Sequence, residues 1–260
     1  MHPVGRLQVF GCGRDRSGIS DERSSAYVPD PDADTEPNAN ANSNANSNAN
    51  SNAVSCSCAD PGSSAAGSRR LASEGDSISV TWGGNHTGMY AKAHADLKHC
   101  GLAVGGSGLN SMIGRIDGVT ACNPKVVTVL IGANGLANAT STDSWTAGLF
   151  GYTDRLRAKG YKVALGTILP QYHATNPNYD AIFNGRRAVV NDAIRGAVGT
   201  HIDAVIDFAA DPVMGPDSAA RNTALYRDGT HPTDGCGPGC GGQGKLFTVY
   251  APVVDRLLGL

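Results

Sequence analysis

Lys125-Val126-Val127-Thr128-Val129-Leu130-Ile131 is the stretch that decides the fold, because it is a short and nearly continuous run of aliphatic and β-branched residues. A run of this length and composition is typical of a strand that is buried on both faces of a parallel sheet. Gly132-Ala133-Asn134 follows it directly, and these residues favour a turn. We therefore predict a central strand that ends in a polar turn at one edge of the sheet.

Short apolar runs and helix-like segments alternate on both sides of this strand. Such alternation is typical of parallel strands joined by crossover helices. The other predicted strands are 71–74, 101–104, 162–169 and 204–208, and the predicted helices are 87–98, 143–159, 180–198 and 245–258. We expect Asp143 to cap the second of these helices. The pattern predicts an α/β domain with a five-stranded parallel sheet over residues 70–260.

Residues 1–69 have a different composition. They contain few large apolar side chains, and Asn alternates strictly with Ala or Ser from Asn38 to Asn52. Such a segment cannot bury enough apolar surface to form a core, so we predict a disordered Asn/Ser-rich tail. An Asn-rich segment that self-associates is the alternative interpretation. Residues 70–260 are numerous enough for an independent core.

Charge and hydropathy exclude several classes of function. The formal net charge of the 260 residues is -2, which gives no electrostatic basis for binding nucleic acid. No apolar stretch approaches the roughly 20 residues that span a bilayer, so we expect no membrane span. We expect a monomer whose partner is a small-molecule or carbohydrate substrate.

The cysteines bear on the cellular compartment. Cys100 could pair with Cys122 and Cys236 with Cys240, which would favour a secreted or periplasmic location. The first residues of the sequence lack the continuous apolar core of a secretory signal, which argues against export. The sequence leaves these two indications in conflict.

A serine follows the first predicted strand, within Gly75-Asp76-Ser77-Ile78. Glycine and aspartate at the end of a strand favour a turn, and this turn would expose the hydroxyl of Ser77. A serine hydroxyl acts as a nucleophile only when it has a base, a group that orients the base, and donors for an oxyanion. Downstream residues must therefore supply these partners.

Asp228-Gly229-Thr230-His231-Pro232 offers the base and its orienting carboxylate. One tight loop can hold Asp228 and His231 within hydrogen-bond reach, and Pro232 would stiffen it. The alternative is a polar surface turn, which Asp-Gly often marks. In combination with the serine turn, we predict Ser77 as nucleophile, His231 as base and Asp228 as the residue that orients the base.

Three groups are candidates for an oxyanion hole: the backbone amides of Ser77 and Gly108 and the carboxamide of Asn134. Each lies just beyond the carboxyl end of a predicted strand, and parallel strands bring these ends to one edge of the sheet. Gly108 could instead be a simple turn residue and Asn134 a helix cap. The shared position beyond strand ends favours the oxyanion interpretation.

Gly75-Asp76-Ser77-Ile78, Ser107-Gly108, Gly132-Ala133-Asn134 and Asp228-Gly229-Thr230-His231 follow the four-block order of the SGNH (GDSL-like) hydrolases. This resemblance covers essentially all of residues 70–260. It implies a three-layer flavodoxin-like sandwich, no metal or other cofactor, and the catalytic roles assigned above.

The resemblance also implies hydrolysis of carboxylic esters through an acyl-enzyme. We expect short acyl chains or acetyl groups, because no long apolar lid segment for a fatty chain is evident. A lysophospholipase or thioesterase that acts on lipids is the alternative within the same fold. Two residues depart from the family pattern: Gly135 stands where Asp is frequent, and Glu74 where an apolar strand residue is usual.

Two interpretations from other classes of protein compete with the hydrolase. His231, Cys236 and Cys240 could be zinc ligands of a non-catalytic zinc- or carbohydrate-binding module, although a fourth ligand is not obvious. Residues 239–245 mimic the start of a phosphate-binding loop, but Leu246 replaces its hydroxyl residue. Finally, Trp82 and Tyr90 could line the substrate site, with ordinary core packing as the alternative for both.

Overall fold

The structure is a computed structural model, and it describes residues 69–260. The tail predicted for residues 1–69 lies outside the described residues, except for Arg69. No helix between residues 69 and 260 combines the length and the apolar character needed to cross a lipid bilayer.

Five parallel strands form the sheet in the order β2-β1-β3-β4-β5. Their bounds are β1 (Arg70–Gly75), β2 (Lys98–Gly101), β3 (Val126–Leu130), β4 (Lys162–Gly166) and β5 (Ala204–Ile206). This is the flavodoxin-like order of an open parallel sheet, and it confirms the predicted α/β fold class. The order changes direction at β1 and β3, where ligands of such sheets bind beyond the strand ends.

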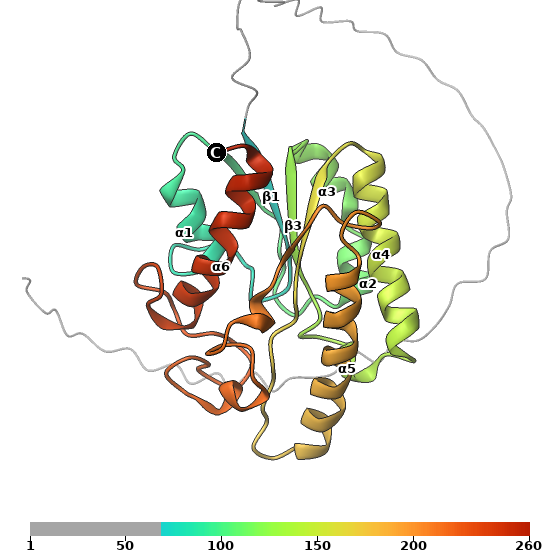
Figure 1. Cartoon of the computed structure of the whole chain (residues 1–260), viewed down its shortest axis with the longest axis vertical. Coiled ribbons are helices and arrows are strands. Elements are labelled where there is room, and N and C mark those ends of the chain that lie inside the picture. The colour runs from blue at the N-terminus through green and yellow to red at the C-terminus, as the bar shows by residue number, and fades with distance from the viewer. Residues whose placement is uncertain (1–68) are drawn as a thin grey trace, which may run out of the picture. The chain divides into compact units, whose positions relative to one another are not determined.

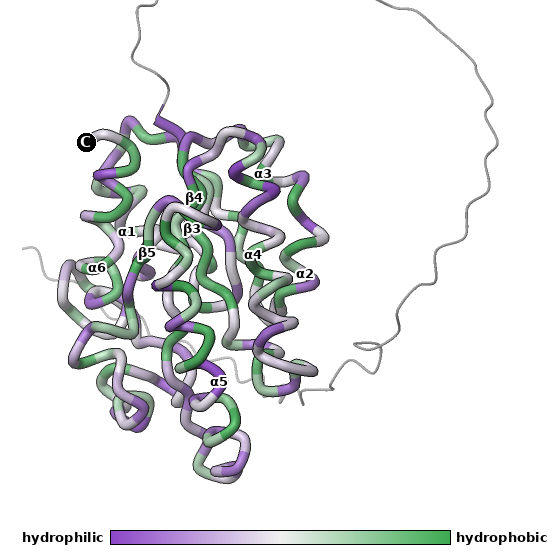
Figure 2. Tube along the Cα trace, turned by 45° about the vertical axis from the view of Figure 1, so that its right-hand side comes forward, coloured by the Kyte–Doolittle hydropathy of each residue, from purple (hydrophilic) through white to green (hydrophobic). Residues whose placement is uncertain are grey.

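Helices cover both faces of the sheet and make three layers (Figure 1). One face carries α1 (His86–Ala93) and α6 (Gly241–Leu258). The other carries α2 (Leu109–Ile113), α3 (Ile116–Cys122), α4 (Thr142–Ala158) and α5 (Pro177–Gly196), and three short 3-10 helices, η1 (Leu136–Asn138), η2 (Phe208–Ala210) and η3 (Asp217–Arg221), lie in the connections. Each face has its own cluster of buried apolar side chains. Figure 2 shows the hydrophobic segments concentrated in the central strands and the sides of the helices that face them.

β3 is the most buried strand, as its sequence predicts. All five of its residues are buried, and it pairs with β1 on one side and β4 on the other. β-branched side chains suit this position because they pack well on both pleated faces.

The predicted helix 87–98 and the predicted strand 101–104 are placed wrongly. The helix, α1, ends at Ala93, and β2 begins already at Lys98. β2 is an edge strand with only partly buried or exposed residues, so no apolar run marks it in the sequence. Apolar periodicity identifies buried elements and misses an edge strand of this kind.

Helix α4 also begins earlier than predicted. Its N-cap is Ser141, whose side-chain oxygen accepts a hydrogen bond from the amide of Ser144 at 3.0 Å, and Asp143 lies in the first turn instead. A hydroxyl at the N-cap satisfies a backbone donor that the helix itself leaves free. Gly160, with φ of +85°, follows the end of the helix in the left-handed conformation that glycine favours there.

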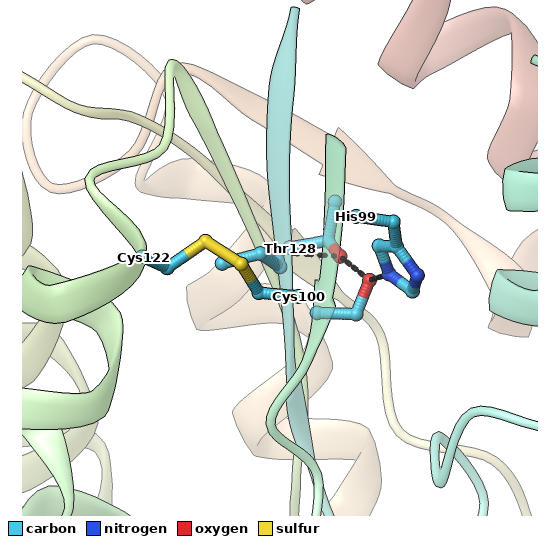
Figure 3. Close-up of a disulfide and its surroundings, with 6 residues drawn as sticks. His99, Cys100, Cys122 and Thr128 are labelled. Atoms are coloured by element: carbon cyan, nitrogen blue, oxygen red, sulfur yellow. Dashed lines mark hydrogen bonds between the residues drawn. A yellow bond between two sulfur atoms is a disulfide. The ribbon is translucent and has the colours of Figure 1, made fainter. Parts of the chain in front are cut away.

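Side chains on both sides of the sheet hold edge strand β2 in place. Cys100 is disulfide-bonded to Cys122 of α3 on one side, whereas on the other side His99 Nε2 lies 2.9 Å from the hydroxyl of Ser73 in β1 (Figure 3). Thr128 of β3 donates a hydrogen bond to the same hydroxyl at 3.2 Å. Two consecutive residues of β2, which point to opposite faces of the sheet, thus fasten this edge strand to its neighbours.

Candidate active site

The turn after β1 carries Ser77, and glycine is required just before it. Gly75 has φ of +148°, and a Cβ at this position would lie 2.1 Å from the carbonyl oxygen of Leu130 in β3. Only glycine adopts this conformation and tolerates so close an approach. β1 and β3 can therefore stay paired up to the point where the chain turns and presents the serine.

Asp76 fastens this turn to the turn after β3. Its carboxylate accepts hydrogen bonds from the amides of Ile78 at 3.0 Å and Ala133 at 3.3 Å, and its side chain is buried. Burial raises the pKa of Asp76 to about 6, although these hydrogen bonds and the nearby His231 act in the opposite direction. One carboxylate thus connects the segment that carries Ser77 to the segment that carries Asn134.

The loop of residues 228–231 carries the other two candidates. The Asp228 carboxylate accepts hydrogen bonds from the amides of Thr230 at 3.0 Å and His231 at 2.7 Å. Gly229, with φ of +81°, allows the loop to pass the carbonyl of Tyr172, from which a Cβ would lie 2.0 Å away. The amide of Tyr172 donates to the carbonyl of Gly229 at 2.9 Å. The loop is therefore fastened at its middle as well as at its ends.

The structure brings these two segments together. His231 Nε2 lies 2.8 Å from Ser77 Oγ, and His231 Nδ1 lies 2.7 Å from the Asp228 carboxylate. Hydrogen bonds from the amide and ring of His231 hold the pKa of Asp228 below its usual value, although partial burial opposes them. This places the carboxylate, imidazole and hydroxyl in an unbroken chain of hydrogen bonds at the carboxyl ends of the strands.

The candidate oxyanion donors lie on the segments that follow β1, β2 and β3. Within residues 69–260, neither the Ser77 amide nor the Gly108 amide has a hydrogen-bond partner. The Asn134 carboxamide donates one N–H to the carbonyl of Ser107 at 3.2 Å, which leaves its second N–H available. Gly108 is the N-cap of α2, and its α-carbon faces the Asn134 backbone. The three donors thus come from the ends of the neighbouring strands β2, β1 and β3.

The segment of Asn134 is held in place although Gly135 stands where the family often has Asp. Gly135 has φ of +86°, a conformation that glycine adopts readily. On the other side of Asn134, the carbonyl of Ala133 accepts a hydrogen bond from Gln171 Nε2 at 2.8 Å. Gln171 is a supporting residue that no sequence motif indicates.

The departure at Glu74 places an acid in the core. Its side chain is 1% exposed and faces Arg115 and Tyr152. Burial raises the pKa of Glu74 to about 7, whereas attraction to Arg115 opposes the increase. A carboxyl group therefore sits directly behind the turn that carries Ser77.

The two aromatic candidates occupy different environments. Trp82 is 40% exposed, beyond the serine turn. Tyr90 is fully buried in the cluster between α1 and α6, and its hydroxyl donates to Asp255 at 2.5 Å. Tyr90 is therefore a core residue, and its assignment to the substrate site is wrong.

Both predicted cysteine pairs form disulfides, Cys100 with Cys122 and Cys236 with Cys240. His231 has both ring nitrogens engaged with Ser77 and Asp228. The three side chains considered as zinc ligands are thus otherwise occupied. Among residues 69–260, no group of three or more His, Cys, Asp or Glu side chains has the arrangement of a metal site.

Solved structures with the same fold include several hydrolases. A GDSL-like lipase from Bacteroides thetaiotaomicron matches with a TM-score of 0.57 at 17% identity, over 74% of this chain and 88% of that one. The lipase/acylhydrolase from Enterococcus faecalis matches with 0.54 at 16% identity, over 74% and 96%. An acetylxylan esterase from Geobacillus stearothermophilus, solved as a catalytic mutant, matches with 0.51 at 16% identity, over 74% and 94%. At these identities the likeness establishes the fold.

The family follows from a match at the level of sequence. No curated protein matches this chain. The model of the GDSL-like lipase/acylhydrolase family matches residues 75–235, which begin at the serine turn and end just after the His231 loop. The chain therefore belongs to the GDSL-like lipase/acylhydrolase family, and it is an SGNH-type hydrolase.

Proposed function

We propose that the protein is a serine esterase that cleaves carboxylic esters through an acyl-enzyme. The hydrogen-bonded chain of Ser77, His231 and Asp228, at 2.8 and 2.7 Å, is the observation that carries this proposal. A hydroxyl, an imidazole and a carboxylate in this order are the groups that acyl transfer requires. The sequence reasoning and the family membership point to the same reaction.

In the first half of the reaction, Ser77 Oγ attacks the ester carbonyl carbon while His231 Nε2 takes the hydroxyl proton. Asp228 accepts the Nδ1–H of His231 and stabilises the imidazolium as it forms. The carbonyl oxygen becomes an oxyanion, which the amides of Ser77 and Gly108 and the Asn134 carboxamide stabilise. Each such donor typically lowers the barrier by about 3 kcal/mol. The intermediate collapses as the alcohol leaves with the proton from His231.

In the second half, a water molecule attacks the acyl carbon of the ester on Ser77. His231 takes a proton from this water and returns one to Ser77 Oγ as the carboxylic acid leaves. The same oxyanion donors stabilise the second tetrahedral intermediate. The enzyme ends in its starting state, and no redox partner is needed.

Short acyl groups are the substrates that we propose. Gly105 lies against Ser77, since a Cβ at that position would be 4.0 Å from the Ser77 Cβ, and the neighbouring Gly106 also carries no side chain. This side of the hydroxyl therefore offers little apolar surface to a long chain. An acetyl group on a carbohydrate fits this description, and one of the structural neighbours is an acetylxylan esterase.

The test is a chain-length series of nitrophenyl esters together with acetylated xylan, measured with the parent protein and with Ser77→Ala. We expect the highest kcat/KM for acetyl or butyryl esters and a loss of several orders of magnitude in Ser77→Ala, with unchanged melting temperature. Parent-like hydrolysis by Ser77→Ala would overturn the mechanism. A maximum at long acyl chains would support the lipid hydrolase instead.

We also propose that residues 70–260 carry the whole activity and that residues 1–69 are a separate tail. Both halves of the proposed catalytic centre lie within residues 75–235, the segment that matches the family. Removal of residues 1–69 is therefore expected to leave kcat/KM unchanged. A fall in kcat/KM of tenfold or more would show that the tail takes part.

A further inference from the structure

We propose that Gln243 is a positioning residue that sets the distance between Ser77 and His231. Ser77 and His231 lie 154 residues apart, and each is carried by a different segment. The buried side chain of Gln243 binds the segment of Ser77, while its backbone binds the segment of His231. This inference rests on the proposed roles of Ser77 and His231, and it adds a residue that no family motif contains.

The Gln243 carboxamide holds the serine turn directly. Its Nε2 donates to the carbonyl of Ile78 at 3.1 Å, and Ile78 is the residue that follows Ser77. Its Oε1 accepts from the backbone amide of His86 at 3.1 Å and from His86 Nδ1 at 2.8 Å. The side-chain carboxamide of Gln243 therefore links the serine turn to His86, the first residue of α1.

His86 makes the orientation of this carboxamide unambiguous. The ring of His86 is 1% exposed and packs edge-on against Phe208 and Tyr250, at 5.6 and 5.1 Å between ring centroids. Burial lowers the pKa of His86 to about 4, so the ring is neutral at ordinary pH. With the proton on Nδ1, both N–H groups of His86 point at Oε1, and the amino group of Gln243 is left for Ile78.

The backbone around Gln243 holds the histidine loop. The Gln243 amide donates to the carbonyl of Thr233 at 2.9 Å, and the Gly242 amide donates to the Thr233 hydroxyl at 2.8 Å. Thr233 lies two residues after His231, and the first turn of α6 is therefore fixed to the end of that loop. One residue thus contacts both segments whose side chains must meet.

Burial makes these contacts strong determinants of geometry. Gln243 is 3% exposed, so loss of its carboxamide would leave the Ile78 carbonyl and the His86 N–H groups with fewer partners in the interior. The serine turn could then relax relative to α6. A displacement of about 1 Å between reacting groups can reduce a rate by about 100-fold.

The experiment compares Gln243→Met with Asn191→Leu, both close in size to the residue they replace. Asn191 is a matched control because it is 2% exposed and its carboxamide also joins two backbone groups, the N–H and carbonyl of Ile168, at 2.7 and 2.9 Å. It contacts neither the serine turn nor the histidine loop. The measurements are kcat and KM for nitrophenyl acetate, the rate of covalent labelling of Ser77 by a fluorophosphonate, and the melting temperature.

We expect both variants to melt at lower temperature, but only Gln243→Met to lose kcat, by about 10- to 100-fold with KM within about twofold. Its labelling rate should fall by a similar factor. A kcat for Gln243→Met within twofold of that of Asn191→Leu would overturn the inference. Gln243→Glu, which keeps the length and the acceptor but loses the donor to Ile78, decides the question by the same criterion if Gln243→Met does not fold.

Ser77→Ala separates failure of this inference from failure of the proposed function. If Ser77→Ala retains activity, the proposed mechanism fails whatever Gln243→Met does. If Ser77→Ala is inactive and Gln243→Met matches the control, only the role of Gln243 is wrong.

Discussion

The two segments that meet at the candidate active site differ in how they are held. The serine turn grows out of the buried strand β1 and is fixed by Asp76, which is 1% exposed. The histidine loop lies near the surface, and the side chain of Asp228 is 49% exposed. Loop 228–231 is held by its own hydrogen bonds, by one contact with Tyr172 and, just beyond its end, by the bonds from α6 to Thr233.

This difference predicts different costs of mutation. Changes at the buried residues around Ser77, such as Gly75 and Asp76, should reduce stability and activity together, because these residues are part of the core. Changes in the histidine loop should reduce activity with little effect on stability, because most of its polar groups can be hydrated if their partners are lost.

Asp228→Ala gives the largest expected effect and tests the exposed segment. Without the carboxylate, the imidazole of His231 loses the group that orients it, and kcat should fall by about 1,000- to 10,000-fold. The free energy of unfolding should change by no more than about 1 kcal/mol. Steady-state kinetics and urea unfolding of the same preparation check both values, and a loss of several kcal/mol of stability would break the contrast.

Gly75→Ala tests the buried segment. The added Cβ would lie 2.1 Å from the backbone carbonyl of Leu130, in a conformation that is strained for alanine. We expect a loss of at least about 3 kcal/mol in the free energy of unfolding, together with a loss of activity.

Gly229→Ala is the matched variant in the exposed loop, with a comparable clash against Tyr172. The loop can shift toward solvent, so activity should fall while stability falls less than in Gly75→Ala. Equal melting temperatures for the two variants would contradict the comparison.

Glu74→Gln tests the cost of the buried acid behind the serine turn. The pKa of Glu74 rises from an ordinary 4.5 to about 7 on folding, so the folded protein binds more protons than the unfolded chain between these values. Stability from this group is complete below about pH 4.5 and is lost as the pH rises to about 7, by about 3 kcal/mol.

Glu74→Gln should remove this loss and unfold at higher urea than the parent at about pH 8. Unfolding curves of the two proteins at about pH 4.5, 6 and 8 measure the difference. Asp76 contributes in both proteins, since its pKa is also raised, and it cancels in the comparison. Parallel pH profiles would show that Glu74 is not the cause.

The smallest expected effect separates the two disulfides. Cys100–Cys122 closes a loop with a sequence separation of 22, at the edge of the sheet, whereas Cys236–Cys240 spans a separation of 4, after the histidine loop. A longer loop restricts the unfolded chain more, so the double Ser variant at 100 and 122 should lose about 1 kcal/mol more stability than the one at 236 and 240. The reverse order in urea unfolding would count against this account.

The core of the fold could be predicted from the sequence because its strands are buried. The run that contains Val126–Leu130 can satisfy its apolar side chains only inside a sheet, and turns with glycine mark its end. β2 could not be found in this way. Its position depends on Cys122 and Ser73, which lie in other elements, and local periodicity carries no information about such partners.

The catalytic candidates could be nominated because motif residues stand at strand ends. The residues that support them could not be nominated, since Gln171 and Gln243 lie in none of the four catalytic blocks and act through contacts with distant groups. Tyr90 shows that sequence position can also nominate a residue wrongly. It follows the serine turn closely in sequence, yet helix α1 directs it into the core, away from the solvent.

Folding of this chain must close a very long loop at one point. Ser77 and His231 are 154 positions apart in the sequence, so their side chains can meet only after the elements between them have packed together. Contacts between distant residues form slowly, because the chain loses conformational entropy before the contacts stabilise it. Recovery of ester hydrolysis after dilution from denaturant should therefore lag behind recovery of helical circular dichroism, and the enzyme becomes competent only at the end of its own folding.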